Sequence, residues 1–311
     1  MHYPKELSIE LTDMCTLRCE LCDNKNIQRP RGFMDLDKFK KLIDEVSAHT
    51  KSINFGVSGE PLLHPQADAF ITYAKAKGMH TSMTTNATLL KAWANRLIAA
   101  GLDDIVLSLD GMTRETYESY RKGPVAGIDH FTPAKEGIQT LCAQRHAMRH
   151  EKPHITISFM VHRHNEHEIE AVKEWSKAIK ADQLLLKSMH FNWAGNDQQV
   201  KSEWAPQNKE FVRHYDYTRL GTCAWVNDNT VIFWNGELAS CCYDLLGKTT
   251  FGNVFQKGFK DVWESPEHRR VQPQMAARTL PQCIGCSAGV KLGTYIDNRS
   301  LITKIMQRAK E

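Results

Sequence analysis

Residues 11–24 read Leu-Thr-Asp-Met-Cys-Thr-Leu-Arg-Cys-Glu-Leu-Cys-Asp-Asn, and this stretch decides how the rest of the chain is interpreted. Its three cysteines, Cys15, Cys19 and Cys22, have the spacing C-x3-C-x2-C. Thiolates at this spacing can bind three corners of a cubane iron–sulfur cluster from one loop, whereas a closed [4Fe–4S] cluster takes four cysteines. One iron would then lack a protein ligand, and an open iron is a place for chemistry.

Two other uses of cysteine fit this spacing less well. Zinc sites more often present cysteines as C-x2-C pairs and then complete a tetrahedron. Disulfides join cysteines in twos, the run holds three, and no secretory signal precedes it. The spacing therefore favours an iron–sulfur cluster.

The stretch resembles the cluster loop of the radical S-adenosylmethionine (SAM) superfamily. The resemblance implies that the open iron chelates the amino and carboxylate groups of SAM, and that one electron from the cluster splits SAM to a 5′-deoxyadenosyl radical. The strand-like run 7–12 agrees with it, because the family places this loop after the first barrel strand. Leu21 is a departure from the family, which usually has an aromatic residue here that packs near the adenine of SAM. By its position the resemblance still implies that Leu21 is a cofactor contact.

Composition limits the class of protein. The chain has 311 residues, 41% of them hydrophobic, which suits one large α/β domain plus a smaller one. A net charge of +4 is too mild to indicate nucleic acid or an anionic membrane as a partner. No apolar run approaches the ~20 residues of a membrane helix, and the N-terminus has no signal core, so we expect a cytoplasmic protein. Nine cysteines in that compartment are better explained as metal ligands than as disulfides.

Short β-branched runs alternate with longer helical patterns over the first two thirds of the chain. The expected strands are 8–12, 52–57, 80–85, 104–109, 155–161 and 183–188, and the expected helices are 39–46, 67–77, 89–100, 114–121, 133–149 and 166–179. Strands separated by helices of this length indicate βαβ units and a parallel sheet. Six units predict an open, partial (β/α)6 TIM-like barrel, the α/β fold that the family resemblance also implies.

The pattern changes after the sixth unit. We expect residues 1–190 to form the radical SAM partial barrel and the polar residues 191–222 to form a bridging region. Residues 223–290 hold five cysteines and a hairpin of 230–234 and 238–241 around Asn235-Gly236, which indicates a small α+β domain. Residues 291–311 are expected to form a tail with a basic helix over 299–310.

Several motifs follow the expected strands, where a parallel barrel has its active site. Gly59, Glu60 and Pro61 follow the second strand and resemble the family's Gly-Gly-Glu segment, which holds the SAM amino group, with Ser58 in place of the first glycine. A tight turn is the alternative reading of these residues. Beside the cysteine loop, the binding function is favoured.

Three further residues follow the third and fourth strands. The resemblance places Asn86 near SAM, and Ser108 and Asp110 along its ribose or carboxylate. A helix N-cap is the alternative for Asn86. Arg121 could clamp a carboxylate because a guanidinium matches that geometry. A surface arginine is the alternative for this position.

The histidines and one further cysteine carry weaker signals. His162, His164 and His167 follow the fifth strand and His190 follows the sixth, so each could act as a proton acceptor, although a solvated loop histidine is the more common outcome. Cys142 falls in a helical run and is expected to be a buried, free cysteine.

A second set of thiols lies in the last third of the chain. Cys223 and Cys241 are separated as C-x12-G-x4-C, and Cys283 and Cys286 form a C-x2-C pair. A zinc ribbon normally has C-x2-C at both ends, which disfavours zinc. The pattern resembles the start of the SPASM extension of radical SAM enzymes. No cysteine follows residue 286, so the match is to the shortened twitch form, which holds one auxiliary [4Fe–4S] cluster. Neighbouring strand residues point to opposite faces, so only one of Cys241 and Cys242 should ligate, and the glycine spacing favours Cys241.

The resemblance covers nearly the whole chain. Within the family, the chain is similar to 2-deoxy-scyllo-inosamine dehydrogenase-type enzymes. It implies dehydrogenation of a small molecule such as a sugar or aminocyclitol, with the auxiliary cluster as electron acceptor and a flavodoxin or ferredoxin as electron donor. Crosslinking, epimerisation or C–C bond formation on a ribosomal peptide or another small substrate is the alternative. The first strand begins close to the N-terminus and leaves no room for a leader-binding domain, which favours a small substrate. An alternative of another class is a non-catalytic iron–sulfur or zinc redox sensor.

Overall fold

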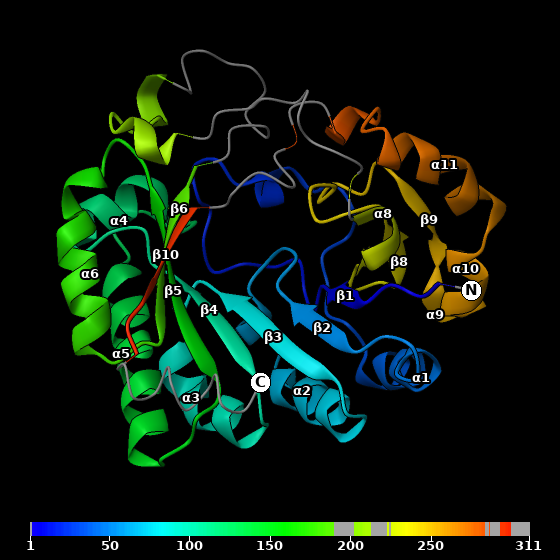
Figure 1. Cartoon of the computed structure of the whole chain (residues 1–311), viewed down its shortest axis with the longest axis horizontal. Coiled ribbons are helices and arrows are strands. Elements are labelled where there is room, and N and C mark those ends of the chain that lie inside the picture. Colours follow the sequence, from blue (N-terminus) through cyan, green and yellow to red (C-terminus); the bar gives the residue numbers. More distant parts are fainter. Residues whose placement is uncertain are drawn as a thin grey trace.

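One continuous sheet organises the protein. The computed structural model describes residues 2–189, 202–212, 223, 225–283, 286 and 293–299. In this part of the chain ten strands form a single sheet with the order β10-β6-β5-β4-β3-β2-β1-β7-β8-β9. Figure 1 shows the first six strands as an open arc with helices on its outer side.

Strands β1 to β6 run parallel to one another and are joined by helices. The strands are β1 (Glu6–Ile9), β2 (Ser52–Phe55), β3 (His80–Thr85), β4 (Asp104–Ser108), β5 (His154–Val161) and β6 (Gln183–Ser188). The helices are α1 (Leu36–Val46), α2 (Ala67–Ala76), α3 (Leu90–Ala99), α4 (Arg114–Tyr120), α5 (Phe131–Ala147) and α6 (Ile169–Ala178). The partial (β/α)6 barrel that the sequence predicts is confirmed.

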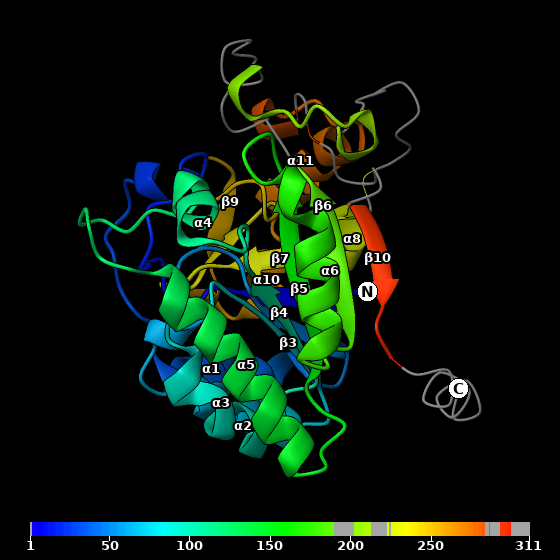
Figure 2. The ribbon, with the colours of Figure 1, turned by 90° about the vertical axis from the view of Figure 1, so that its left-hand side faces the viewer.

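The helices form where capping residues and apolar stripes coincide. Asp35 caps α1 by accepting a hydrogen bond from the amide of Lys38. The buried side chains of α1 recur every three or four residues, which turns one stripe of the helix toward the sheet. These side chains are Phe39, Leu42, Ile43 and Val46. Figure 2 shows α6 in the same role, beside β5 and β6.

The two faces of the sheet differ in chemistry. Side chains that face the helices, such as Ile53, Phe55 and Ile105, are completely buried. Successive strand residues point to opposite faces, so the alternate residues face away from the helices. These include Asn54, Ser82, Thr84 and Ser108, and all of them are only partly buried. The inner face of the barrel therefore carries several small polar groups, beside apolar residues such as Val106.

The first strand differs from the prediction of 8–12. It spans Glu6–Ile9, and the chain after it turns into a loop. The strand ends where two side chains form hydrogen bonds with the loop that follows. The carboxylate of Glu10 accepts a hydrogen bond from Arg29, and the hydroxyl of Thr12 donates to the carbonyl of Gly32 at 2.6 Å.

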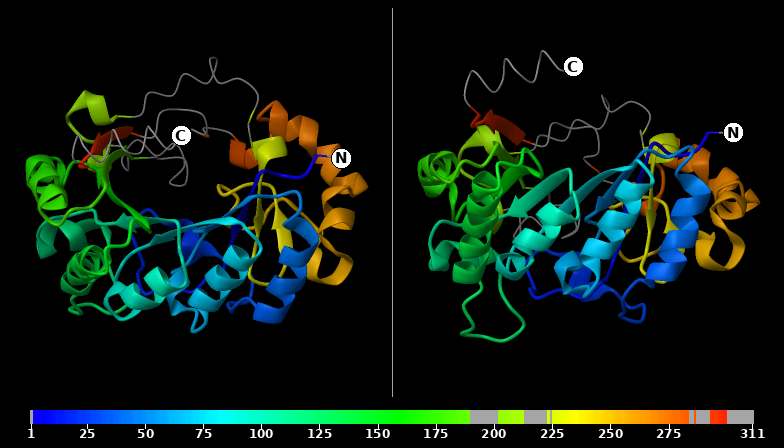
Figure 3. Two further views of the ribbon diagram at one scale, coloured as in Figure 1. Left: turned by 60° about the horizontal axis from the view of Figure 1, so that its bottom comes forward. Right: turned by 90° about the horizontal axis from the view of Figure 1, so that it is seen from below.

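The cysteine-rich extension continues the barrel sheet. Strand β7 (Asn229–Ile232) pairs in parallel with β1, and β8 (Glu237–Ala239) and β9 (Thr250–Asn253) follow as antiparallel neighbours. The hairpin of β7 and β8 forms around Asn235-Gly236, as the sequence predicts, with Gly236 at a φ of 92°. The extension's helices are α8 (Trp225–Asp228), α9 (Val254–Lys257), α10 (Phe259–Trp263) and α11 (Pro266–Ala276). Figure 3 shows this extension beside the β1 edge of the barrel. The division of the chain into separate domains stays a prediction.

The far edge of the sheet holds a strand that the sequence did not predict. Strand β10 (Gly293–Asp297) pairs antiparallel with β6, within the tail expected over 291–311. Most of the expected helix 299–310, His190 and most of the bridging region 191–222 lie outside the described residues. Among the residues that are described, no helix has the length and apolar character needed to cross a membrane.

Candidate functional site

The loop between β1 and α1 carries the first three cysteines and is closed at its base. Thr12 forms an antiparallel bridge with Phe33, and the amide of Met34 donates to the carbonyl of Leu11 at 2.9 Å. Inside this base the carbonyl of Asp13 accepts a hydrogen bond from the side-chain amide of Asn24 at 2.8 Å. The loop is therefore held by its own backbone and polar side chains.

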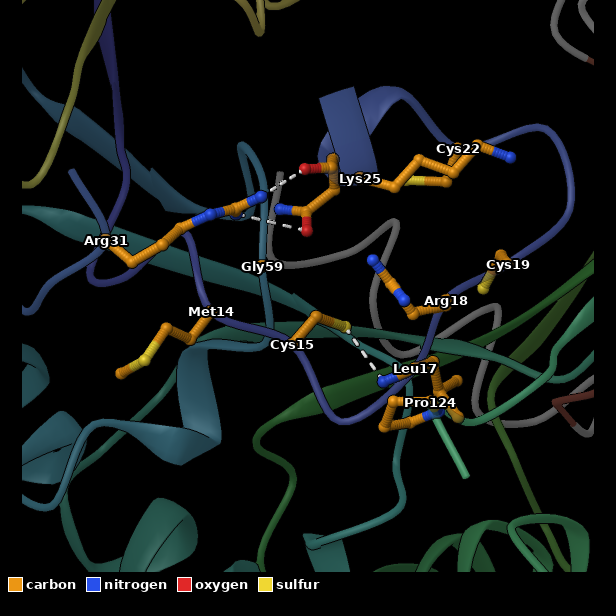
Figure 4. A pocket seen from close by; sticks show the side chains of 11 residues that line it. Met14, Cys15, Leu17, Arg18, Cys19, Cys22, Lys25, Arg31, Gly59 and Pro124 are labelled. Carbon is orange, nitrogen blue, oxygen red and sulfur yellow. Dashed lines mark hydrogen bonds between the residues drawn. The ribbon is translucent and has the colours of Figure 1, made fainter. Parts of the chain in front are cut away.

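Cys15, Cys19 and Cys22 line one cavity of about 320 Å³. Figure 4 shows the three side chains at separate positions along its wall. The other lining residues are Met14, Leu17, Arg18, Asn24, Lys25, Arg31, Gly59 and Pro124. The structure thus brings the predicted triad together, with Gly59 from the segment after β2 beside it.

The donor set of this cavity fits a cluster better than a single ion. Among the described residues, no three His, Cys, Asp or Glu side chains converge as one metal ion would require. A cubane spreads its cysteine ligands over separate irons, which matches thiols spaced around a cavity. Burial raises the pKa of Cys15 to about 11 and the pKa of Cys19 to about 12, so these thiols hold their protons unless a metal replaces them.

Gly59 lies directly under the cysteine loop. Its φ is 70°, and a Cβ placed there would stand 2.3 Å from the carbonyl oxygen of Thr12 and 2.6 Å from that of Met14. The next amide, that of Glu60, donates to the carbonyl of Met14 at 2.7 Å. Only glycine allows this close approach. The segment after β2 is therefore a backbone support for the cysteine loop.

Glu60 is completely buried, and its carboxylate is occupied by the chain itself. It accepts hydrogen bonds from the hydroxyl of Thr85 at 2.6 Å, the amide of Asn86 at 2.8 Å and the amide of Leu62 at 3.1 Å. Burial raises the pKa of Glu60, and these hydrogen bonds oppose the rise. Pro61 follows as the first residue of a short 3-10 helix, Pro61–Leu63. Glu60 thus joins the ends of β2 and β3 to each other.

Asn86 reaches the cysteine loop from the end of β3. Its side-chain amide donates to the hydroxyl of Thr16 at 3.0 Å and lies 3.6 Å from the sulfur of Cys15. Its side-chain oxygen accepts from the amide of Thr88 at 3.0 Å. Helix α3 begins after Leu89 without a side-chain cap, so Asn86 does not cap it.

Asp110 and Arg121 form a buried ion pair at the end of β4. The Nε and one terminal nitrogen of Arg121 both lie 2.7 Å from one oxygen of Asp110. The other oxygen accepts from the amide of Met160 at 2.8 Å. The positive charge of Arg121 also opposes the rise of the pKa of Cys19, which places it near the thiol cavity. Arg121 is therefore not a surface arginine. Ser108 ends β4 on the polar inner face.

An aromatic cluster packs against the cysteine loop. Leu21 and Cys19 pack against a buried group of Tyr120, Met189 and Trp204. The ring of His162 joins this group, 5.3 Å from that of Trp204. His162 is buried, which lowers its pKa to about 4, so it is neutral near pH 7. The other two predicted histidines of this segment, His164 and His167, are exposed.

The second set of cysteines also gathers in one region. Cys286 and Cys223 are close enough to Cys283 to contribute electrostatically to its raised pKa. Cys283 contributes in the same way to the pKa of Cys241. The amide of Cys286 donates to the carbonyl of Cys283 at 3.0 Å, which closes the C-x2-C turn. Burial raises the pKa of Cys241 to about 12. These pairwise interactions bring Cys223, Cys241, Cys283 and Cys286 into one region, and their shared cluster stays a prediction.

Cys242 packs differently from its neighbour. It contacts a buried group formed by Val231, Phe233 and Ala239, whereas Cys223 and Cys283 pack against the main core. Cys242 also interacts electrostatically with Cys241 and Cys286, so the choice of Cys241 over Cys242 as the ligand stays a prediction. Cys142 is buried in α5, as expected from the sequence.

Sequence reasoning missed two residues of the loop region. Glu10 and Arg29 form a buried ion pair at 2.6 Å beneath the cysteine loop. Neither residue belongs to a motif, and their only signal is a charged residue directly after a buried strand.

Two family models match the chain. The model of the radical SAM superfamily matches residues 9–176, which is more than half of the chain. The model of an iron–sulfur cluster-binding domain, SPASM, matches residues 223–287. The first match contains the triad of Cys15, Cys19 and Cys22, and the second begins at Cys223.

Individual relatives extend over most of the chain. It is 24% identical to the tungsten-containing aldehyde ferredoxin oxidoreductase cofactor-modifying protein of Pyrococcus furiosus, over 91% of this chain and 87% of the relative. The crystal structure of Streptococcus suis SuiB bound to S-adenosylmethionine matches with a TM-score of 0.64 and 17% identity, over 92% of this chain and 71% of SuiB. SuiB has also been solved with its precursor peptide SuiA. BtrN in complex with AdoMet and 2-DOIA matches with a TM-score of 0.50 and 15% identity, over 90% of this chain and 91% of BtrN. At these identities the solved structures show a shared fold.

Proposed function

Because this chain belongs to the radical SAM superfamily and carries a SPASM region after its barrel, we propose that it dehydrogenates a small polar molecule such as a sugar or aminocyclitol. The observation that carries the proposal is the convergence of Cys15, Cys19 and Cys22 on one cavity beside Asn86 and Arg121. When bound, the two [4Fe–4S] clusters and SAM supply the radical chemistry, namely cleavage of SAM to a 5′-deoxyadenosyl radical and removal of the substrate's second electron.

The residues around the triad have separate tasks in this proposal. The three thiolates hold the first cluster, and Asn86 donates a hydrogen bond next to Cys15. Asp110 fixes Arg121 through two of its nitrogens, and among the described residues no acceptor hydrogen-bonds the third nitrogen, Nη1. A guanidinium nitrogen held in this way can receive the carboxylate of SAM. Gly59, Glu60, Pro61, Ser108 and Leu21 complete the proposed SAM site.

The inner face of the sheet supports a small polar substrate. Asn54 stands beside Ser82 in the strand register, and Ser108 stands beside Ser158. The side-chain oxygen of Asn54 is buried and lacks a hydrogen-bond partner within the described residues. Hydroxyl and amide groups of this kind match the hydroxyl and amino groups of a sugar or aminocyclitol, because buried polar groups need hydrogen bonds.

The extension supports an oxidation. Cys223, Cys241, Cys283 and Cys286 would give the auxiliary cluster four protein ligands. A saturated cluster offers no coordination position to the substrate, so electron transfer is the role that remains for it. The electron that starts each turnover would come from a protein such as a flavodoxin or ferredoxin.

Modification of a ribosomal peptide is the second candidate. It is favoured by the match to SuiB, which extends over 92% of this chain and has been solved with a precursor peptide. The two candidates differ in the size and chemistry of the substrate, and the same assay can distinguish them.

The proposed function is tested first by cleavage of SAM. The protein is reconstituted anaerobically with iron and sulfide and given SAM and dithionite, and 5′-deoxyadenosine is measured. We expect product from the wild type and none from the variant with alanine at Cys15, Cys19 and Cys22. Cys142→Ala is the matched control, since Cys142 is a buried cysteine in α5 that does not line the cavity of the triad, and it should leave the product unchanged. Product from the triple variant would refute the assignment of the triad.

Iron content and substrate dependence test the remaining parts. Two four-iron clusters predict about eight irons per chain, and about four would mean that the second cysteine set binds zinc or nothing. Reconstituted enzyme is then incubated with aminocyclitols, sugars and peptides, and the products are analysed by mass. A product two hydrogens lighter than a cyclitol or sugar supports the proposal. Turnover of peptides alone would replace it with the second candidate.

A further inference from the structure

A buried carboxylate at the end of β1 ties three segments together. Glu10 accepts hydrogen bonds from Arg29 at 2.6 Å, from the hydroxyl of Ser58 at 2.5 Å and from the backbone amide of Trp234 at 3.3 Å. Arg29 belongs to the cysteine loop, Ser58 to the segment that supports it and Trp234 to the extension. The side chain of Glu10 has no solvent exposure, so these three partners satisfy a charge that water cannot reach.

Arg29 makes further contacts with the extension. Besides Glu10, its guanidinium donates to the carbonyl of Leu245 at 2.6 Å and lies 3.9 Å from the centre of the Phe233 ring. Both Leu245 and Phe233 belong to the extension. The third nitrogen, Nε, lies 3.8 Å from a carboxylate oxygen of Asp13, two residues before Cys15, as an ion pair without a hydrogen bond, and neither atom has a hydrogen-bond partner among the described residues. One side chain thus bridges the extension and the cysteine loop.

The extension also touches the base of the loop directly. A Cβ on Gly32 would stand 2.5 Å from the indole ring of Trp234, so the ring lies flat against the glycine backbone. Gly32 is the residue whose carbonyl accepts from Thr12 and whose amide donates to Asp13. The hairpin that carries Phe233 and Trp234 therefore contacts the loop at its closing point.

We propose that Arg29 is a positioning residue that transmits the placement of the extension to the loop of Cys15, Cys19 and Cys22. It acts through Glu10 on the sheet side and through Asp13 on the loop side, while Phe233 and Leu245 fix its other end. The occupancy of the loop by a cluster rests on the proposed function, but the mechanical connection does not. The consequence is that changes in the extension alter the loop around the first cluster.

The connection is tested by hydrogen–deuterium exchange of the full chain without iron, followed by mass spectrometry. Arg29→Lys keeps the charge beside Glu10 but cannot also reach Leu245 and cover Phe233 with a planar group. We expect the amides of residues 13–26 to exchange roughly ten- to hundredfold faster, the range for losing a hydrogen bond to a charged group. Phe233→Leu, a change in the extension alone, should accelerate the same amides.

Two further variants separate this role from general stability. Arg96→Lys is the matched control, because Arg96 also pairs with a carboxylate, Asp68, and covers an aromatic ring, Trp93, at 3.7 Å, but lies on α3. It should leave residues 13–26 unchanged. The double variant Glu10→Gln/Arg29→Met removes the charges of Glu10 and Arg29 together and leaves Asp13 with Arg31 at 3.9 Å. We expect it to recover stability against urea without recovering protection of the loop.

The outcomes are distinct. Exchange of residues 13–26 within about twofold of the wild type in a folded Arg29→Lys protein would overturn the proposal. Equal acceleration in β3 and β4 would overturn it too, since that result indicates loss of global stability. After reconstitution, the electron paramagnetic resonance signal of the reduced protein with SAM should be altered in Arg29→Lys and unaltered in Arg96→Lys. Absence of 5′-deoxyadenosine in the wild type would contradict the proposed function, but it would leave the exchange result of the iron-free chain valid.

Discussion

Replacing Gly59 with alanine should destabilise the protein because two separate costs meet at this residue. The first is conformational, since a φ of 70° lies in the left-handed region that L side chains avoid. The second is steric, since the new Cβ would lie 2.3 Å from the carbonyl oxygen of Thr12 and 2.6 Å from that of Met14. Real Cβ atoms almost never come within 3.0 Å of such an atom, so the backbone that leads into Cys15 must move.

Gly78 separates these two costs. It ends α2 with a φ of 73°, nearly the same as that of Gly59, but its Cβ would meet nothing within 4 Å. We expect Gly78→Ala to lower the free energy of unfolding by about 1 kcal/mol, the conformational cost alone. Overpacking adds about 1 to 3 kcal/mol, so Gly59→Ala should lose about 2 to 4 kcal/mol.

Urea unfolding of the iron-free wild type and both variants measures these losses. Because the displaced atoms belong to the cysteine loop, Gly59→Ala should also retain less iron after reconstitution and form less 5′-deoxyadenosine, whereas Gly78→Ala should match the wild type in both. Equal destabilisation by the two substitutions would refute the steric argument. Full iron content in Gly59→Ala would refute the view that the segment after β2 supports the loop.

Three further predictions concern other parts of the site. Arg121→Met leaves Asp110 buried without its partner and should cost about 3 to 5 kcal/mol in urea unfolding, while Asp110→Asn/Arg121→Met should recover stability but not 5′-deoxyadenosine. Burial lowers the pKa of His162 to about 4 from its ordinary 6.5, so the unfolded chain takes up the proton first as the pH falls through this window. As the pH falls from 6.5 toward 4, the free energy of unfolding of the wild type should therefore decrease by up to ~1.4 kcal/mol per pH unit more than that of His162→Gln. Parallel profiles of unfolding free energy against pH would contradict this. Cys241→Ser should lose about four irons and Cys242→Ser none, and the reverse result would exchange their roles.

Local sequence signals were sufficient for the barrel. β-branched runs alternate with apolar stripes of helical period, and both patterns depend on residues within one element. The third strand, His80–Thr85, and the sixth, Gln183–Ser188, therefore begin and end where the sequence predicts. The first strand ends earlier, because Glu10 and Thr12 bond to residues about 20 positions away. Strand β10 was missed because its partner, β6, lies more than 100 residues before it.

In the candidate site, too, residues within one segment could be predicted from the sequence, whereas residues with distant partners could not. Cys15, Cys19 and Cys22 were recognisable because a single loop supplies all three. Arg121 was ambiguous in the sequence, since its partner Asp110 is separated from it by the whole of α4. Glu10 and Arg29 carried no motif, and the contacts that define them come from an extension more than 200 residues further along the chain. Sequence pattern thus identifies candidate ligands, whereas the residues that hold the cysteine loop in place emerge only from tertiary packing.

Ser58 shows why a departure from a motif need not weaken it. The family segment has glycine here, so the serine initially counts against the match. In the structure its hydroxyl donates to Glu10 at 2.5 Å, and Gly59 still makes the close approach to the cysteine loop. The hydroxyl satisfies a carboxylate that also binds Arg29 and the amide of Trp234. A glycine at this position would leave that buried charge one hydrogen bond short, at a cost of about 1.5 to 3 kcal/mol. The serine is therefore matched to Glu10, and the two positions should be interpreted together.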